Sequence, residues 1–180
     1  PGGKSFFAAS IAEGRAEILS CDIHRRKLGL VKASSARLGM NIKTRENDAR
    51  VFVPEWENKF DRIICDLPCS GTGIIRKKPD IRFKSEESLE QLPELQIEIL
   101  NNAARYLKPG GRMLYSTCTW RTEENEDVVE RFIMGNRGFD LTGFDNPFTG
   151  ETENAGMMTL LPGKYGTDGF FICLMRKKDV

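Results

Sequence analysis

Short apolar runs of strand length alternate with segments of helical spacing along this 180-residue chain. Strand patterns cover residues 16–22, 41–46 and 60–65, and helical spacing covers residues 3–13 and 24–38. Strands separated by helices of this length imply crossover connections and a mostly parallel α/β sheet covered on both faces. In such a sheet, ligands bind beyond the carboxyl ends of the strands. The residues that follow each strand are therefore the informative ones.

The second half of the chain continues the alternation, and its length suits one domain with a sizeable core. The expected order is loop 67–84, helix 85–107, strand 112–116, helix 122–136, and strands 139–144 and 169–175. Pro93 predicts an irregularity within the long helix, because proline lacks the amide hydrogen that the helix uses. Lys108-Pro109-Gly110-Gly111 is expected to interrupt the chain before the next strand.

Three acids and a cysteine stand at consecutive strand ends, namely Asp22, Asp48, Asp66 and Cys118. We expect all four to face one crevice, since the carboxyl ends of parallel strands lie at one edge of the sheet. An acid at the carboxyl end of a strand is the usual partner of ribose hydroxyls in such a sheet, which suits Asp22 at the end of strand 16–22. Asp48, one strand further along, could accept a hydrogen bond from an adenine amino group.

Glycines at the start of the chain, in Pro1-Gly2-Gly3-Lys4, would let the backbone approach a ligand closely at a helix N-terminus. A glycine pair is weak support by itself, because most such pairs only form a turn. No G-x-G-x-x-G pattern is present, which disfavours a nicotinamide cofactor.

The formal net charge is only +1, so composition alone does not indicate a nucleic-acid-binding protein. Basic clusters are usually solvated faces. The cluster Arg76-Lys77-Lys78, with Arg82 and Lys84, differs because it directly follows the most reactive-looking segment. No apolar run approaches the ~18 residues of a membrane-spanning helix, and no signal-peptide pattern opens the chain. We therefore expect a cytoplasmic protein with no membrane partner.

The five cysteines are Cys21, Cys65, Cys69, Cys118 and Cys173. An odd number without secretory context argues against a disulfide scaffold. No metal site is expected, because Cys65 and Cys69 have unsuitable spacing for zinc and His24 is the only histidine. Three of the cysteines lie within apolar runs and are predicted to be small core residues. Cys69 and Cys118 do not.

These two thiols lie in unusual segments. Cys69 belongs to Asp66–Gly73, a loop in which proline and glycines present an acid and a thiol together. Cys118 has small hydroxyl residues on both sides, unlike an inert core cysteine. Taken singly, each thiol suits loop packing as well as chemistry. A cysteine nucleophile needs a lowered pKa, and the N-terminus of helix 122–136 offers one source near Cys118.

The sequence resembles the Sun (Fmu) family of RNA 5-methylcytosine methyltransferases, whose best-known members modify small-subunit ribosomal RNA. The resemblance covers nearly the whole chain. It rests on P-G-G-K (1–4), C-D-I (21–23), N-D-A (47–49), D-L-P-C-S-G-T-G (66–73), R-K-K-P-D-I-R (76–82), L-K-P-G-G (107–111), Y-S-T-C-T (115–119), E-E-N-E (123–126) and D-G-F-F (168–171).

The resemblance implies a Rossmann-like class I methyltransferase sheet flanked by helices, with an antiparallel last strand. It implies S-adenosylmethionine as the methyl donor, S-adenosylhomocysteine as its product, and RNA as the partner. Cys118 would attack carbon 6 of cytosine, after which carbon 5 takes the methyl group. Cys69 would assist product release by β-elimination, Asp66 would bond the cytosine ring, and Lys4 would touch the base or cofactor.

The remaining implied residues fall into two groups. Cofactor binding is assigned to Pro1, Gly2, Gly3, Lys4, Asp22, Asp48 and Asp66. RNA binding is assigned to Arg76, Lys77, Lys78 and Arg82. Carbon 5 of cytosine is too weak a nucleophile to take a methyl group unaided, so covalent activation at carbon 6 agrees with the chemistry. The base must also be unstacked, which favours single-stranded or loop RNA.

The chain begins within the family's first motif. We therefore expect residues 1–180 to be an N-terminally truncated catalytic domain without the first central strand or the RNA-binding domain. Two other functions remain open. A DNA cytosine methyltransferase would use Cys69 as the nucleophile, although the S-T-C-T segment and E-N-E triplet argue against it. A catalytically inert RNA-binding assembly factor would keep the fold without methylating. The sequence indicates neither the target cytosine nor the oligomeric state.

Overall fold

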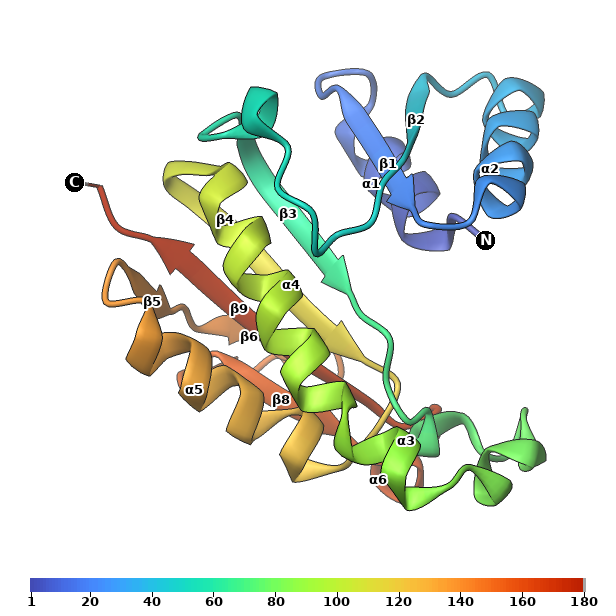
Figure 1. The fold of residues 1–180 in the computed structure, drawn as a ribbon, viewed down its shortest axis with the longest axis vertical. Coiled ribbons are helices and arrows are strands. Elements are labelled where there is room, and N and C mark those ends of the chain that lie inside the picture. Colours follow the sequence, from blue (N-terminus) through green and yellow to red (C-terminus); the bar gives the residue numbers. More distant parts are fainter. Residues whose placement is uncertain (180) are drawn as a thin grey trace. The chain divides into compact units, whose positions relative to one another are not determined.

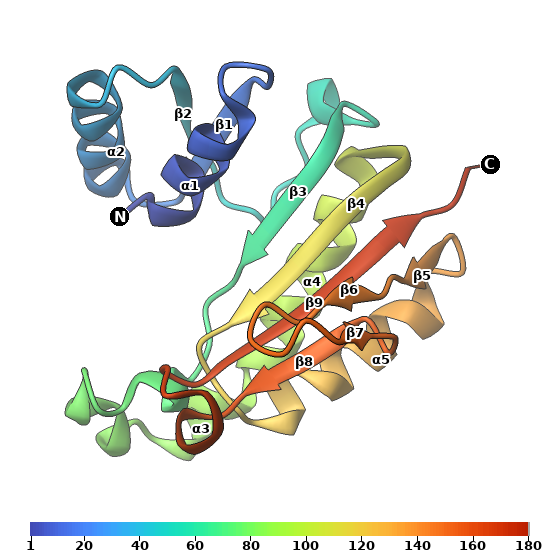
Figure 2. The same ribbon diagram turned by 180° about the vertical axis from the view of Figure 1, so that it is seen from behind.

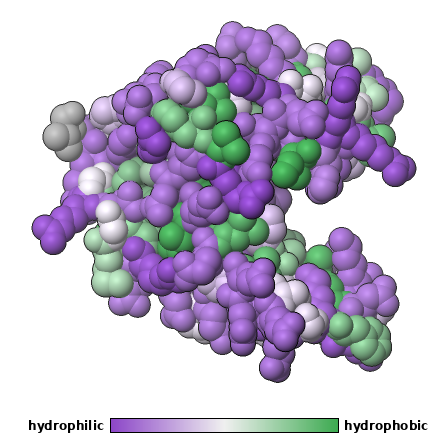
Figure 3. Space-filling view, viewed as in Figure 1, coloured by the Kyte–Doolittle hydropathy of each residue, from purple (hydrophilic) through white to green (hydrophobic). Residues whose placement is uncertain are grey.

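The computed structural model describes residues 1–179, which form two compact units that divide between Val51 and Phe52 (Figure 1). Among these residues, no helix combines the length and apolar character needed to cross a membrane. Polar and charged residues cover most of the face in Figure 3, and apolar patches interrupt them.

The first unit is a two-stranded parallel sheet with two helices. Its elements are α1 (Gly3–Ala12), β1 (Ile18–Asp22), α2 (Arg25–Arg37) and β2 (Ile42–Glu46). The strands pair in register from Ile18 opposite Ile42 to Asp22 opposite Glu46. Each element lies within two residues of its predicted end or start, because apolar spacing and the turn at Gly39 mark the boundaries.

The second unit carries the larger sheet, with strand order β3-β4-β9-β5 and β8 also paired with β9. Its strands are β3 (Phe60–Asp66), β4 (Leu107–Thr117), β5 (Phe139–Leu141), β8 (Met157–Leu160) and β9 (Phe170–Lys177), and β6 (Phe144–Asp145) and β7 (Thr152–Glu153) form a separate pair. Its helices are η1 (Pro54–Trp56), η2 (Thr72–Ile74), η3 (Pro79–Phe83), α3 (Glu86–Glu90), α4 (Leu92–Tyr106), η4 (Thr122–Glu124), α5 (Glu126–Gly135) and α6 (Pro162–Tyr165). No strand among residues 1–179 pairs with the second edge of β3.

The sheet is mixed. β3 and β4 are parallel, whereas β9 runs antiparallel to β4, β5 and β8. The antiparallel last strand is confirmed, but a mostly parallel sheet is not. Residues 161–169 connect β8 to β9. A crossover between parallel strands needs a dozen or more residues, so this short connection joins antiparallel neighbours.

The core of this unit lies between one face of the sheet and the helices α4 and α5, which lie side by side in front of the strands in Figure 1. Figure 2 shows the strands from the opposite side. Alternate residues of β9, Phe171, Cys173 and Met175, are fully buried against this helical layer, as the two-residue period of a strand requires. The prediction of buried cysteines is confirmed for Cys65 and Cys173, but it is wrong for Cys21, which is exposed.

Four predicted boundaries are wrong. The strand expected over 139–144 ends at Leu141 as β5, and Phe144 belongs to β6 in the separate pair. The helix expected over 85–107 is two helices, because the chain turns at Gln91 and Pro93 lies in the first turn of α4. The helix expected over 122–136 divides at Asn125 into η4 and α5. Residues 108–111 belong to β4, where the register shifts between the pairs Phe60–Leu107 and Arg62–Arg112.

A lysine on β9 secures the end of α4. The Lys177 ammonium donates to the carbonyl oxygens of Ala104 and Leu107, at 3.2 and 2.8 Å, and to the Asn58 side chain at 3.0 Å. Lysine satisfies helix C-terminal carbonyls in this way, which ties the helix to the sheet.

Candidate active site

The structure brings together the two thiols that the sequence separates by 49 positions. Cys69 follows β3 and Cys118 follows β4, and the parallel register places Asp66 opposite Ser116. The two sulfur atoms are 3.2 Å apart, and the Cys118 amide donates to the Cys69 sulfur at 3.3 Å. Both thiols are partly accessible, which leaves them open to a reactant.

The hydrogen bond with Cys118, followed by burial, raises the pKa of the Cys69 thiol far above its usual value. A thiol that keeps its proton can donate S–H to the neighbouring sulfur. That hydrogen bond favours negative charge on the acceptor, as any hydrogen bond to a charged form does. The contact can therefore hold one thiol and one thiolate, with Cys69 as the protonated partner.

Asp66 ends β3 beside these segments. Its exposed carboxylate accepts a hydrogen bond from the Ser116 hydroxyl at 3.4 Å. The carboxylate therefore lies at the carboxyl end of β3, on the same side as the segment that carries Cys118.

The basic cluster divides into two parts. Arg76, Lys77, Lys78 and Arg82 are exposed. Lys77 pairs with Asp168 at 2.5 Å. Lys84 instead donates to the carbonyl oxygen of Ser70 at 2.8 Å, so it supports the Cys69 loop.

Two predicted cofactor residues, Asp22 and Asp48, lie at the carboxyl ends of neighbouring strands in the first unit. The Asn47 amide donates to the Asp22 carbonyl at 3.2 Å, which ties these two ends together. The Asp22 carboxylate accepts from the His24 amide at 2.8 Å and from Lys27 at 3.2 Å. Both acids therefore belong to one edge of this small sheet.

Asp48 has a close partner of its own. Its carboxylate accepts from the Arg50 guanidinium at 2.6 to 3.1 Å and from the Arg50 amide at 3.0 Å. These side-chain and backbone hydrogen bonds lower the pKa of Asp48 to about 2. The acid is thus an anion at neutral pH and can accept hydrogen bonds from a ligand.

Of the two glycines at the chain start, Gly2 is closely packed, whereas a Cβ atom on Gly3 would have no atom within 4 Å. Gly2 precedes α1 with a φ of 90°, and a Cβ atom there would lie 2.9 Å from both Phe6 and Val31. Only glycine fits this position without strain. Lys4 follows on the exposed side of α1.

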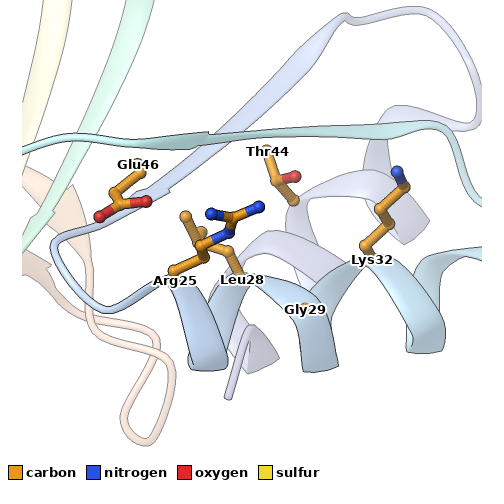
Figure 4. Close-up of a pocket in the computed structure, with 6 residues that line it drawn as sticks. All are labelled: Arg25, Leu28, Gly29, Lys32, Thr44 and Glu46. Atoms are coloured by element: carbon orange, nitrogen blue, oxygen red, sulfur yellow. The ribbon is translucent and has the colours of Figure 1, made fainter.

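A shallow hollow of about 350 Å³ lies between α2 and β2 (Figure 4). Its lining residues are Arg25, Leu28, Gly29, Lys32, Thr44 and Glu46. None of them is a predicted site residue.

Sequence reasoning missed the buried polar residues behind the thiols, above all Glu124, Asn125 and Gln96, whose side chains are fully enclosed. The E-E-N-E motif entered the sequence analysis as part of the resemblance and as an argument against a DNA methyltransferase, and no structural role was predicted for it. The available signal was spacing, because Glu124 and Asn125 each precede one residue of the apolar pair Val128-Val129 by four positions, as residues on one helix face do.

Comparison with known proteins places this arrangement in a family. The family model of the 16S rRNA methyltransferase RsmB/F matches residues 1–176. The probable ribosomal RNA small subunit methyltransferase B of Bacillus subtilis (strain 168) is 40% identical over 189 residues, which cover 99% of this chain and 41% of that protein.

Two crystal structures share the fold. PH0851 superimposes with a TM-score of 0.90 at 33% identity, over 98% of this chain and 40% of that chain. NSun6 from Pyrococcus horikoshii with SFG gives a TM-score of 0.82 at 31% identity, over 98% of this chain and 45% of that chain. The fold is the Rossmann-like fold of class I methyltransferases. The chain spans about 41% of the length of its curated Bacillus relative. Because the family model covers almost every residue, this chain belongs to the RsmB/F family of 16S rRNA methyltransferases.

Proposed function

We propose that this chain is the catalytic domain of a cytoplasmic enzyme that transfers a methyl group from S-adenosylmethionine to carbon 5 of cytosine in RNA. Small-subunit ribosomal RNA is the proposed substrate, since the Bacillus relative is named for it. The observation that carries the proposal is the 3.2 Å contact between the sulfur atoms of Cys69 and Cys118. Reversible covalent activation of a base requires one group to attack and another to assist departure.

Cys118 attacks carbon 6 of the cytosine as a thiolate, and the new sulfur–carbon bond moves electron density to carbon 5. Asp66 bonds the ring and stabilises the charge that develops on it. After methylation, the carbon 5 proton passes to solvent, and the resulting β-elimination breaks the sulfur–carbon bond and returns its electron pair to Cys118 as a thiolate. Cys69 assists this release, and before the attack it keeps its proton and stabilises the Cys118 thiolate, in line with its raised pKa.

S-adenosylmethionine, when bound, supplies the methyl group. Asp22 is suited to accept hydrogen bonds from its ribose hydroxyls and Asp48 from its adenine amino group. Pro1, Gly2, Gly3 and Lys4 are proposed to approach the same ligand. SFG, an analogue of S-adenosylmethionine, accompanies the NSun6 relative.

The exposed residues Arg76, Lys77, Lys78 and Arg82 are proposed to contact phosphates of the RNA. Phosphate contacts of this kind fix the position of a nucleic acid without reading its sequence. The target base itself must leave its stack to reach a thiol, so single-stranded or loop RNA is the expected form.

Covalent trapping tests the roles of the two thiols. With RNA and S-adenosylmethionine, Cys69→Ala is expected to accumulate an RNA–protein adduct that survives denaturing electrophoresis, whereas Cys118→Ala forms none. Cys21→Ala, which removes an exposed thiol, is the matched control and should behave as the wild type. The opposite pattern, with the adduct on Cys69, would contradict the assignment.

Labelled methyl transfer tests the activity itself. Incorporation of the label into carbon 5 of cytosine is expected from the protein together with any further domains that its gene encodes. A protein that binds the cofactor and RNA but transfers no label is an assembly factor, and the proposed function is then wrong.

A further inference from the structure

The two thiol-bearing segments are supported by a buried polar network that the proposed chemistry does not use. Glu124 is its centre, with a side chain that has no exposed surface. One carboxylate oxygen accepts the Ser70 amide at 2.8 Å and the Gln96 amide group at 3.2 Å. Ser70 directly follows Cys69, so Glu124 fixes the backbone next to the first thiol.

Gln96 extends this support to the other side of Cys69. Its amide group also donates to the Pro68 carbonyl oxygen at 2.8 Å. Glu124 and Gln96 together therefore hold the residues immediately before and after Cys69.

Asn125 does the same for Cys118. Its side-chain oxygen accepts the Thr117 hydroxyl at 2.6 Å, and its side-chain nitrogen donates to the Thr119 carbonyl oxygen at 3.1 Å. Thr117 and Thr119 flank Cys118, and Asn125 is also the residue that directly precedes α5. Asn125 therefore holds the residues on both sides of Cys118.

The two supported segments are joined to each other. The Thr119 hydroxyl lies 2.8 Å from the Ser70 hydroxyl and 2.7 Å from the Thr72 hydroxyl. The Gly73 amide donates to the Cys118 carbonyl oxygen at 2.9 Å. These hydrogen bonds fix the two segments relative to each other.

The energetics argue that the network serves geometry more than stability. Within residues 1–179, the second oxygen of Glu124 and the side-chain oxygen of Gln96 are buried without a hydrogen bond. The second Glu124 oxygen lies 3.7 Å from the Arg121 guanidinium, which is beyond hydrogen-bond distance. A buried carboxylate with an unsatisfied oxygen is costly, and an apolar residue would stabilise a core better.

We propose that Glu124 and Asn125 are positioning residues, which hold the Cys69 and Cys118 sulfur atoms in contact by fixing the backbone on either side of each thiol. The consequence for methyl transfer rests on the proposed function, but the thiol geometry does not. A displacement of about 1 Å can reduce an enzymatic rate on the order of 100-fold, so loss of either residue should reduce kcat.

Thiol–disulfide exchange measures the geometry without RNA. In a glutathione buffer, oxidation of the two thiols to one disulfide reduces one oxidised glutathione to two glutathione molecules. The equilibrium gives the effective concentration of one thiol at the other. In a Cys21→Ala background, Glu124→Ala and Asn125→Ala should each lower it by about ten-fold or more.

Matched controls are available on the same elements. Glu123→Ala removes the neighbouring acid of η4, whose side chain is 60% exposed. Asn136→Ala removes the asparagine at the opposite end of α5. Both controls should leave the effective concentration unchanged. Glu124→Gln keeps an oxygen for the Ser70 amide and should restore most of the loss.

Methyl-transfer kinetics supply the second measurement. Glu124→Ala and Asn125→Ala should each lower kcat by about ten-fold or more. The KM values for RNA and for S-adenosylmethionine should change less than about two-fold. An unchanged effective concentration in the folded variants overturns the inference, as does a change in KM alone. If Glu124→Ala does not fold, Asn125→Ala decides. If the wild type transfers no methyl group, the proposed function fails, and the exchange equilibrium still decides the positioning role.

Discussion

Gly73 offers a severe test of the contact between the thiol segments. A Cβ atom on Gly73 would lie 2.1 Å from the carbonyl oxygen of Gly169 and 2.8 Å from that of Cys118, whereas ordinary contact begins at 3.4 Å. Both neighbours are backbone atoms, which no side-chain rotation can move away. Gly73→Ala must therefore displace one of the segments.

The magnitude follows from what the displacement breaks. The Gly73 amide bonds the Cys118 carbonyl at 2.9 Å, and the Gly73 carbonyl accepts the Gly169 amide at 2.8 Å. Two hydrogen bonds at about 1 kcal/mol each, with overpacking of about 1–3 kcal/mol, predict a loss of about 3–5 kcal/mol in the free energy of unfolding. Such a loss is a large part of the total stability of a domain.

Urea unfolding followed by circular dichroism measures this loss. Gly135→Ala is the control, because it lies in the last turn of α5 with no atom within 4 Å of the added methyl group. It should be neutral or stabilising by up to about 1 kcal/mol. A loss below about 1 kcal/mol for Gly73→Ala, with an unchanged m-value, would refute the packing argument.

Two further predictions concern charged groups. Lys177→Met removes the bonds to the end of α4 and to Asn58, so it should lower the free energy of unfolding in urea by about 1–3 kcal/mol. Lys178→Met removes bonds to the exposed Asp140 carboxylate and to the exposed Arg137 carbonyl oxygen, so it should cost less than about 1 kcal/mol, and equal losses would contradict the capping role. The Asp48 carboxyl should titrate by NMR with a pKa of about 2 and return toward 3.8 in Arg50→Gln. Because the folded pKa is lowered, this pair stabilises the fold above about pH 4 and the contribution disappears as the pH falls toward 2. An unshifted Asp48 in the wild type would show that the ion pair is absent in solution.

The sequence predicted individual elements well and their assembly less well. Apolar spacing located α1, α2, β2 and β3, because a helix or strand that buries one face needs that spacing locally. The antiparallel position of β9 came only from the resemblance, since spacing within a strand says nothing about the direction of its neighbour. The break at Gln91 was foreseen only as an irregularity, because the choice between a kink and a new helix depends on tertiary packing.

The candidate site shows the same division. Local motifs pointed to Asp66, Cys69 and Cys118, because a reactive group needs unusual neighbours in the chain. The network of Glu124, Asn125 and Gln96 was missed, since a buried polar residue cannot be told from an exposed one by its type.

The sequence by itself therefore determined the family and the reactive groups, which are carried by short motifs whose chemistry belongs to residues adjacent in the chain. Only the tertiary structure decided that Cys69 and Cys118 touch. Their 3.2 Å contact depends on the register between β3 and β4 and on hydrogen bonds from α4 and η4. Register and burial are set by packing among distant segments, and a one-residue slip between β3 and β4 would move the thiols apart.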